Sequence, residues 1–264
     1  METVLYEVAD GIATITLNRP DVLNSMNPQL VADITDAFDQ AGADDDVGAI
    51  VMTGTGRGFC AGADLNATSD RPAGLSTGQG VAHSMETSFN PMVRKIVGSP
   101  KPTLCAVNGV AAGGGVGLAL CCDIVLAGKS ASFVQVFGPQ LGLIPDIACT
   151  YFLPRLIGTA RARALAFTGE KLSAEKAADW GLIYACVEDD ALMTTTMGIA
   201  TKLANGPTPT FPVIRQAFAD AELNTIDAQL DYERDTQGKL GDHPNFSEGV
   251  KAFLQKRPPQ FSRR

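Results

Sequence analysis

The chain has 264 residues, a formal net charge of −8 and 45% hydrophobic residues, which indicates a packed globular protein rather than a disordered one. The acidic balance argues against nucleic-acid binding as the main role. Apolar stretches are interrupted before they reach membrane-spanning length, and the N-terminus lacks the features of an export signal, so we expect a cytoplasmic protein without a membrane partner.

Alternating apolar residues on both sides of Asp10-Gly11 predict a β-hairpin. Asn27-Pro28 is typical of a helix start, with Asn as the N-cap and Pro in the first helical position, and this helix should end near Gly42. The segment GAIVMTG, residues 48–54, predicts a short buried strand that runs into the loop TGRGFCAGADL.

In the middle of the chain, residues 66–80 are small, polar or Gly/Pro-rich, which predicts a mobile surface loop. A helix should follow from about 81 to 97, with a kink at Pro91. TLCAVNG, from Thr103, predicts another strand, and it leads into Gly113–Gly115 at the start of a buried helix. The strand DIVLAG follows.

Further helices are predicted over 153–167 and 173–180, the second with Ser173 as its N-cap. The tail from about residue 190 should be mostly helical, with a break at Pro207-Thr208-Pro209. The recurring order of strand, glycine loop and helix predicts an α/β core. We place this core at residues 1–203 and a C-terminal helical region at 204–264.

The six cysteines contain no C-x-x-C pair, and most lie in apolar segments, so we interpret them as reduced core residues. His83 and His243 are the two histidines of the chain, which argues against a histidine-rich metal site or a histidine-based triad. We therefore expect no bound metal.

The two glycine-rich turns can each bring backbone N–H groups close to a ligand. At Gly113–Gly115 these groups also lie at a helix N-terminus, where they are unpaired. One N–H from each turn could meet at one oxygen and form an oxyanion hole. Alternatively, the glycines only permit tight packing. A P-loop is excluded because its lysine signature is missing, and the dinucleotide fingerprint lacks its last glycine.

Several motifs together resemble the enoyl-CoA hydratase/isomerase (crotonase) superfamily over essentially the whole chain. They are GRGFCAGADL (56–65), NGVAAGGGVGLALCCD (108–123) and LGLIPD (141–146), with NRPDVLNSM (18–26) and FSEGVKAFLQKRPPQF (246–261). The resemblance implies an α/β fold, a spiral of ββα turns with a C-terminal helical region used in trimer assembly. It also implies a homotrimer or a dimer of trimers.

The resemblance further implies an acyl-CoA thioester substrate and no metal or redox cofactor, coenzyme A being part of the substrate. It places the oxyanion-hole N–H groups at Ala63 and Gly114. It assigns coenzyme A contacts to Val22, Ala61, Gly62, Ala63, Asp64, Leu65, Phe253 and Lys256. The last two could come from a neighbouring subunit, and Lys256 is alternatively a solvated lysine of the tail.

Hydratases of this family carry two glutamates that handle the water. The matching positions here are Gly117 and, depending on the register, Gly138 or Phe137. No Asp or Glu occurs between Asp123 and Asp146, and we interpret Asp123 as a cap or turn residue.

Asp146 matches the position of the single acid/base in double-bond isomerases of the family. An aspartate in apolar surroundings has a raised pKa, which suits a group that removes an α-proton and returns it further along the acyl chain. Alternatively, Asp146 caps the helix that follows Pro145. Relatives usually have a Gly-Gly pair soon after this acid, whereas Ile147–Thr150 follow here, and residues 133–142 include one extra position.

We therefore predict a CoA-thioester isomerase that shifts a double bond or opens a ring through an enolate. The segment FVQVFGPQLGLIPD resembles ring-opening isomerases of phenylacetate catabolism, so an epoxidised or unsaturated arylacetyl-CoA, or a dienoyl-CoA, is the expected substrate. The alternatives are an enoyl-CoA hydratase or another crotonase activity, a CoA-binding scaffold without catalysis, and a dinucleotide oxidoreductase.

Overall fold

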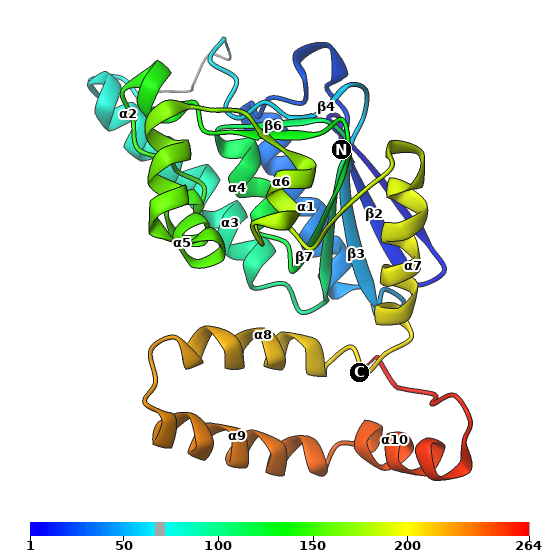
Figure 1. Ribbon diagram of the computed structural model, residues 1–264. Helices are drawn as coiled ribbons and strands as arrows, with labels where there is room; N and C mark the ends of the chain where they lie inside the picture. Colours follow the sequence, from blue (N-terminus) through cyan, green and yellow to red (C-terminus); the bar gives the residue numbers. More distant parts are fainter. Residues whose placement is uncertain (67–71, 264) are drawn as a thin grey trace.

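The computed structural model describes residues 1–66 and 72–263. Two sheets form its centre, one of six strands in the order β1-β2-β3-β5-β7-β10 and one of four in the order β4-β6-β8-β9. The strands are β1 (Val4–Ala9), β2 (Ile12–Leu17), β3 (Ala49–Gly54), β4 (Gly58–Cys60), β5 (Thr103–Val107), β6 (Val110–Ala112), β7 (Ile124–Gly128), β8 (Ser132–Val134), β9 (Leu172–Ser173) and β10 (Ala185–Val187). Figure 1 shows the longer strands side by side.

The chain alternates between the two sheets. Strands β3, β5 and β7 are parallel neighbours in the first sheet, and each is followed directly by its counterpart β4, β6 or β8 in the second. Helices follow each pair: α2 (Thr77–Ser84) and α3 (Asn90–Val97), then α4 (Gly114–Leu120), then α5 (Cys149–Thr168). This repeat is the predicted spiral of ββα turns. The second sheet was not anticipated from the sequence because its strands have only two or three residues each.

The predicted hairpin is confirmed, since β1 and β2 pair in antiparallel register with Ala9 opposite Ile12. Asp10 and Gly11 have positive φ angles of 52° and 76°, as a tight two-residue turn between right-twisted strands requires. Strand β3 is buried on both faces. Ile50 and Met52 join the main core, while Ala49 and Val51 pack with residues of α7 (Leu192–Ala204).

Two helix predictions are confirmed with their caps. Asn27 accepts a hydrogen bond from the N–H of Leu30 at the start of α1 (Pro28–Ala43). Ser173 caps α6 (Ala174–Asp179) by accepting from Lys176. Both caps satisfy an N–H that the first helical turn leaves without a partner.

Other boundaries differ from the prediction. The helix expected from residue 81 begins at Thr77, because Ser76 and Gln79 form a capping box; residues 67–71 of the predicted loop lie outside the described part. In place of one helix kinked at Pro91, the structure has a π-helical turn, η2 (Met85–Phe89), between α2 and α3, just before Pro91. Helix α5 begins at Cys149, four residues earlier than predicted.

Asp123 is not a helix cap. Its carboxylate accepts hydrogen bonds from the N–H and hydroxyl of Thr103 and pairs with Arg215 of α8 (Thr210–Ala221) at 2.5 Å. This bond between core and tail is formed across 92 residues of sequence, so the residue pattern did not reveal it.

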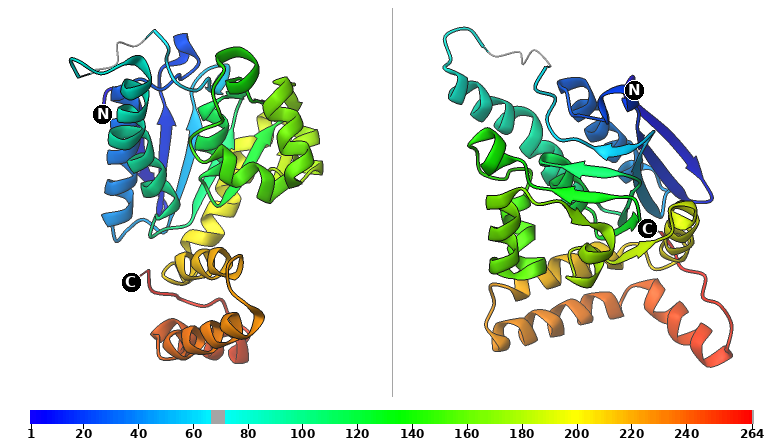
Figure 2. Two further views of the ribbon diagram at one scale, coloured as in Figure 1. Left: turned by 90° about the vertical axis from the view of Figure 1, so that its left-hand side faces the viewer. Right: turned by 45° about the horizontal axis from the view of Figure 1, so that its top comes forward.

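The predicted break at Pro207–Pro209 separates α7 from three further helices, α8, α9 (Ile226–Gly241) and α10 (Pro244–Gln255). These helices form a layer beyond one end of the core in each view (Figures 1 and 2). Among the described residues after Ala204, Ala252 is the only buried hydrophobic one. The division of the chain after residue 203 stays a prediction.

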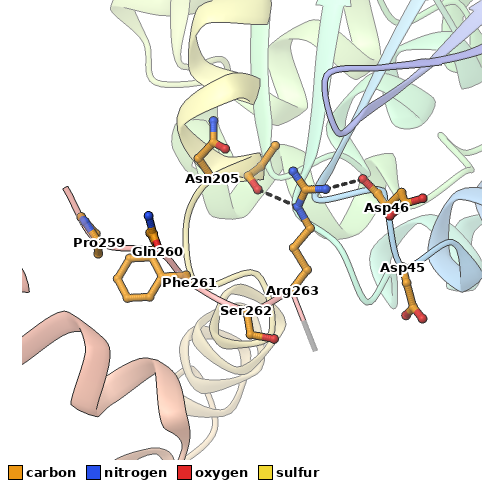
Figure 3. A pocket seen from close by; sticks show the side chains of 9 residues that line it. Asp45, Asp46, Asn205, Pro259, Gln260, Phe261, Ser262 and Arg263 are labelled. Atoms are coloured by element: carbon orange, nitrogen blue, oxygen red, sulfur yellow. Dashed lines mark hydrogen bonds between the residues drawn. The ribbon is translucent and has the colours of Figure 1, made fainter.

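The C-terminal tail returns to the core, where the Arg263 guanidinium donates to the carbonyls of Ala204 and Asp46 (Figure 3). A cavity of about 450 Å³ lies beside it, lined by residues 259–263, by Asp45 and Asp46 after α1, and by Ala204 and Asn205 at the end of α7. None of its lining residues belongs to the predicted site. Over the described residues, we find no helix with the length and apolar character needed to cross a membrane.

Candidate active site

The first site loop follows β4 and is held by Met26. The N–H of Met26 donates to the carbonyl of Gly62 at 2.7 Å, and the N–H of Asp64 donates to the carbonyl of Met26 at 3.0 Å. Because Gly62 and Asp64 supply both of these bonds, the N–H of Ala63 between them points away from Met26. It donates to no described residue, and Ala63 is exposed. An ion pair of 3.0 Å from Arg19 to Asp64 also holds this loop.

The second site loop lies directly against the first. Gly62 has a φ of 91°, and a Cβ atom there would lie 2.8 Å from the carbonyl oxygen of Ala112 and 3.3 Å from the nitrogen of Gly114. Any larger residue at position 62 would therefore push the two loops apart. The structure thus brings the loop of Ala63 together with Gly114, two segments that are 51 positions apart in sequence.

Gly114 is the first residue of α4, after Gly113 with φ 52° and ψ −124°. The N–H of Gly113 is used, since it donates to Val134 at 2.9 Å, whereas the N–H of Gly114 has no acceptor among the described residues. It also carries the positive end of the dipole of a fully buried helix. Two free N–H groups on touching loops are what an oxyanion hole needs.

Asp146 lies between a π-helical turn, η3 (Phe137–Leu141), and α5, and its side chain is partly buried. Burial raises its pKa to about 6, and the only opposing influence is its own backbone N–H. The alternative that Asp146 caps the next helix is wrong. The N-cap residue of α5 is Ala148, and no side chain caps this helix.

Asp146 is joined to the oxyanion loop through its neighbour Ile147. A Cβ at Gly114 would lie 2.7 Å from Cδ1 of Ile147, and a Cβ at Gly117 would lie 2.0 Å from its carbonyl oxygen. The residue after the acid therefore packs on the first turn of α4. This contact places the segment of Asp146 beside the turn of Gly114, which in turn lies against the loop of Ala63.

The two positions that match the hydratase glutamates are closed by backbone atoms. Gly117 faces the Ile147 carbonyl as described, and a Cβ at Gly138 would lie 2.7 Å from the carbonyl oxygen of Ala166. In the other register the position is Phe137, which is buried. A glutamate could not be placed at either glycine without moving the backbone of this chain, so its local packing matches the absence of the two acids.

The residues predicted to bind coenzyme A fall into two groups. Val22, in η1 (Pro20–Val22), and Leu65 are 42% and 74% exposed, and the N–H of Ala61 donates to Leu23 at 3.0 Å, so this group surrounds the first loop. Phe253 and Lys256 are exposed on α10 and just after it. Figure 1 shows α10 at the opposite end of the molecule from β4, so one chain does not bring the two groups together.

Sequence reasoning missed the backbone after the acid. Ile147 and Ala148 have positive φ angles of 47° and 58°, which residues with a side chain rarely adopt. It also missed the hydrogen bond between the buried side chains of Gln135 and Cys149, the residue that follows Ala148. The departure from the usual Gly-Gly pair was the only sequence signal for either.

The model of the family "Enoyl-CoA hydratase/isomerase" matches residues 7–264, nearly the whole chain. The chain belongs to this family. It is 48% identical to 1,2-epoxyphenylacetyl-CoA isomerase of Escherichia coli strain K12, over 99% of both chains. It is 41% identical to a protein of Rhodobacter capsulatus named "Probable enoyl-CoA hydratase", over 99% of this chain and 98% of the relative.

Solved structures of the family share the fold. The crystal structure of an enoyl-CoA hydratase from Bacillus anthracis superposes with a TM-score of 0.90 at 29% identity, covering 99% of this chain and 100% of that one. The predicted fold class and family are thereby confirmed. The chain is an enzyme of the enoyl-CoA hydratase/isomerase family that acts on a CoA thioester. The relatives carry both isomerase and hydratase names, so membership alone does not distinguish the two reactions.

Proposed function

We propose that the protein is an acyl-CoA isomerase with Asp146 as its single acid/base. The observation that carries the proposal is that this one carboxylate, whose pKa is raised to about 6 by burial, occurs together with the free N–H groups of Ala63 and Gly114. A pKa near 6 leaves the group mostly ionised at neutral pH, yet able to hold a proton during turnover.

In the proposed reaction the thioester carbonyl accepts hydrogen bonds from Ala63 and Gly114. These bonds make the α-proton more acidic and stabilise the enolate oxygen that forms when Asp146 removes that proton. The electron pair then moves along the conjugated chain, and Asp146 returns the proton to a carbon further along. The result is a shifted double bond, with no net change in atoms. For an epoxide carbon bonded to the α-carbon, the same electron pair can form a C=C bond while the epoxide C–O bond breaks, and Asp146 then gives its proton to the alkoxide oxygen.

We propose an epoxidised or unsaturated arylacetyl-CoA as the substrate class, with a role in phenylacetate catabolism. The support is the 48% identity to an enzyme named 1,2-epoxyphenylacetyl-CoA isomerase. We propose no metal or redox cofactor, because abstraction and return of a proton need only the acid/base and the two N–H groups.

We also propose that the enzyme works as a homotrimer or a dimer of trimers in the cytoplasm. The support is the exposed apolar surface of the C-terminal helices and the position of Phe253 and Lys256, far from the first loop of their own chain. In such an assembly, these two residues of one subunit would contact coenzyme A bound to the next.

The deciding experiment measures two rates on one enzyme preparation: hydration of crotonyl-CoA, and conversion of a matched β,γ-unsaturated CoA thioester to its α,β isomer. Hydration needs a second group to activate water, and both hydratase positions lack one. We expect isomerisation to be faster by at least ~10²-fold, the scale of one acid–base group. Hydration at an equal or higher rate would favour the hydratase, the function for which the 41% identical relative is named.

A further inference from the structure

Cys149 bonds both to the segment of Asp146 and to the Gly113–Gly114 turn. Its N–H donates to the carbonyl of Asp146 at 2.9 Å, and its Sγ lies 3.8 Å from the carbonyl oxygen of Gly113 as a donor. Nε2 of Gln135 donates to the same sulfur at 3.6 Å. Cys149 and Gln135 are 0% and 2% exposed, so water does not compete for these bonds.

The direction of the sulfur's hydrogen bonds follows from its protonation and its neighbours. Burial raises the pKa of Cys149 to about 12, so the group is a neutral thiol at physiological pH. Because Gln135 donates to the sulfur, the thiol hydrogen is free for an acceptor. The carbonyl of Gly113 is the acceptor in reach.

The Gly113 carbonyl belongs to the same peptide unit as the Gly114 N–H. A hydrogen bond accepted by that carbonyl polarises the unit and strengthens its N–H as a donor. It also fixes the plane of a peptide bond between two glycines, whose backbone is otherwise the most free to rotate. The thiol therefore acts on the one peptide whose N–H is proposed to hold the substrate oxygen.

We propose that Cys149 is a positioning residue for the reaction: its thiol orients and polarises the Gly113–Gly114 peptide, while its backbone N–H holds the segment of Asp146. The inference deepens the proposed function and rests on it. It also accounts for the backbone after the acid. Left-handed Ile147 and Ala148 turn the chain so that Cys149 points inward at the start of α5. Such strained conformations persist where neighbouring contacts hold them.

The test compares Cys149→Ala and Cys149→Ser with a matched control, Cys105→Ala. Cys105 is equally buried on β5, and its thiol bonds with Cys122 rather than with the site. The assay separates kcat from KM for a β,γ-unsaturated CoA thioester. Infrared difference spectroscopy on a bound, non-reacting CoA thioester measures the shift of its carbonyl stretch, which reports the strength of the oxyanion hole.

We expect Cys149→Ala to lower kcat about five-fold, the scale of one neutral hydrogen bond, with KM unchanged and a smaller carbonyl shift. Cys149→Ser, which retains a donor, should recover most of kcat and most of the carbonyl shift. Cys105→Ala should change neither kcat nor the carbonyl shift. Should Cys149→Ala fail to fold, Cys149→Val fills the same space without a donor and is expected to show the same loss.

The outcomes distinguish failure of the positioning role of Cys149 from failure of the proposed function. A wild-type enzyme that does not shift the carbonyl stretch would contradict the oxyanion hole itself. A normal wild-type shift that survives unchanged in Cys149→Ala, together with an unchanged kcat, would overturn the positioning role alone. An equal loss in Cys105→Ala would also overturn it, because the effect would then come from the loss of any buried thiol.

Discussion

The α/β core and the C-terminal helices bury their apolar residues to very different extents. Strands β3 and β5 are buried almost throughout. In the first turn of α4, carbonyl oxygens of neighbouring segments lie where the Cβ atoms of residues larger than glycine would be. On the C-terminal helices, by contrast, Phe218, Phe253 and Leu254 are 73%, 83% and 74% exposed. An apolar cleft of about 730 Å³, lined by Phe246, Val250 and neighbouring residues, lies among these helices.

The difference suggests that the core serves catalysis and that the C-terminal helices serve assembly. The groups proposed for the chemistry lie within one chain, where close packing fixes the free N–H groups and raises the pKa of the acid. The C-terminal helices expose several large apolar side chains and an apolar cleft, features that often mark a binding surface. We therefore expect changes in the core to act on turnover, and changes in the helices to act on assembly and on binding of coenzyme A.

The largest effect should come from Gly114→Pro. Proline is tolerated at the first position of a helix but has no N–H, so the variant loses one oxyanion donor. We expect turnover to fall by about 10²–10³-fold. Gly114→Ala is the matched control, because it adds a Cβ against the flexible end of Ile147 but keeps the N–H. If circular dichroism shows both variants folded and they have equal rates, Gly114 is not a catalytic donor.

Asp146→Asn should keep the shape of the site and remove the base, which lowers turnover at least ~10²-fold with little change in affinity for the CoA thioester. Asp123→Asn is the control, since Asp123 pairs with Arg215 and takes no part in the proposed chemistry. The control should lower the free energy of unfolding but retain turnover. Near-normal turnover of the purified Asp146→Asn variant would remove Asp146 from the mechanism.

These core residues could be proposed from the sequence because local patterns mark them. Glycines after a strand, the N-cap residues Asn27 and Ser173, and an isolated acid in an apolar segment each leave a signature within a few residues. The hairpin, most helices and the family followed from such signatures.

Features that depend on distant contacts were not predictable in the same way. The short strands of the second sheet gain their stability from neighbours rather than from their own residues. The bonds of Cys149 join it to Gln135 and Gly113, which are 14 and 36 positions away. The left-handed backbone at Ala148 contradicts local preference, and only the packing around it makes it possible.

Leu254→Asp on α10 should have a smaller effect on turnover and a large effect on the molecular mass of the assembly. A charge in an apolar contact between subunits is costly, so light scattering of the variant should show monomers at the micromolar concentration at which we expect the wild type to form trimers. We expect KM for the CoA thioester to rise about ten-fold, the scale of a lost interface contact. Tyr184→Asp, at a residue with similar exposure outside these helices, should leave the mass of the assembly and KM unchanged. A wild type that is a stable monomer would rule the assembly out.

The smallest effect concerns stability, and it links the core's packing to its chemistry. The pKa of Asp146 is raised from 3.8 to about 6 because burial disfavours the charged form. Below pH 3.8 the folded and unfolded states are both protonated, and the group costs nothing. As the pH rises from 3.8 to 6 the unfolded state loses its proton first, so the free energy of unfolding falls, and above pH 6 the penalty is constant.

Asp146→Asn resembles the protonated form at every pH, so it should be as stable as the wild type near pH 4 and more stable above pH 6. A shift of about two units at 1.36 kcal/mol each sets an upper bound of about 3 kcal/mol, and partial exposure reduces it to about 1–2 kcal/mol. Urea unfolding of both proteins from pH 4 to pH 8 measures the difference. Wild-type kcat/KM should rise through the same window around pH 6, because the base must be ionised to act. The acid would then destabilise the fold over the pH range in which it becomes active. A stability difference that does not change with pH, or a kcat/KM that is flat between pH 5 and pH 7, would mean that burial does not raise the pKa of this group.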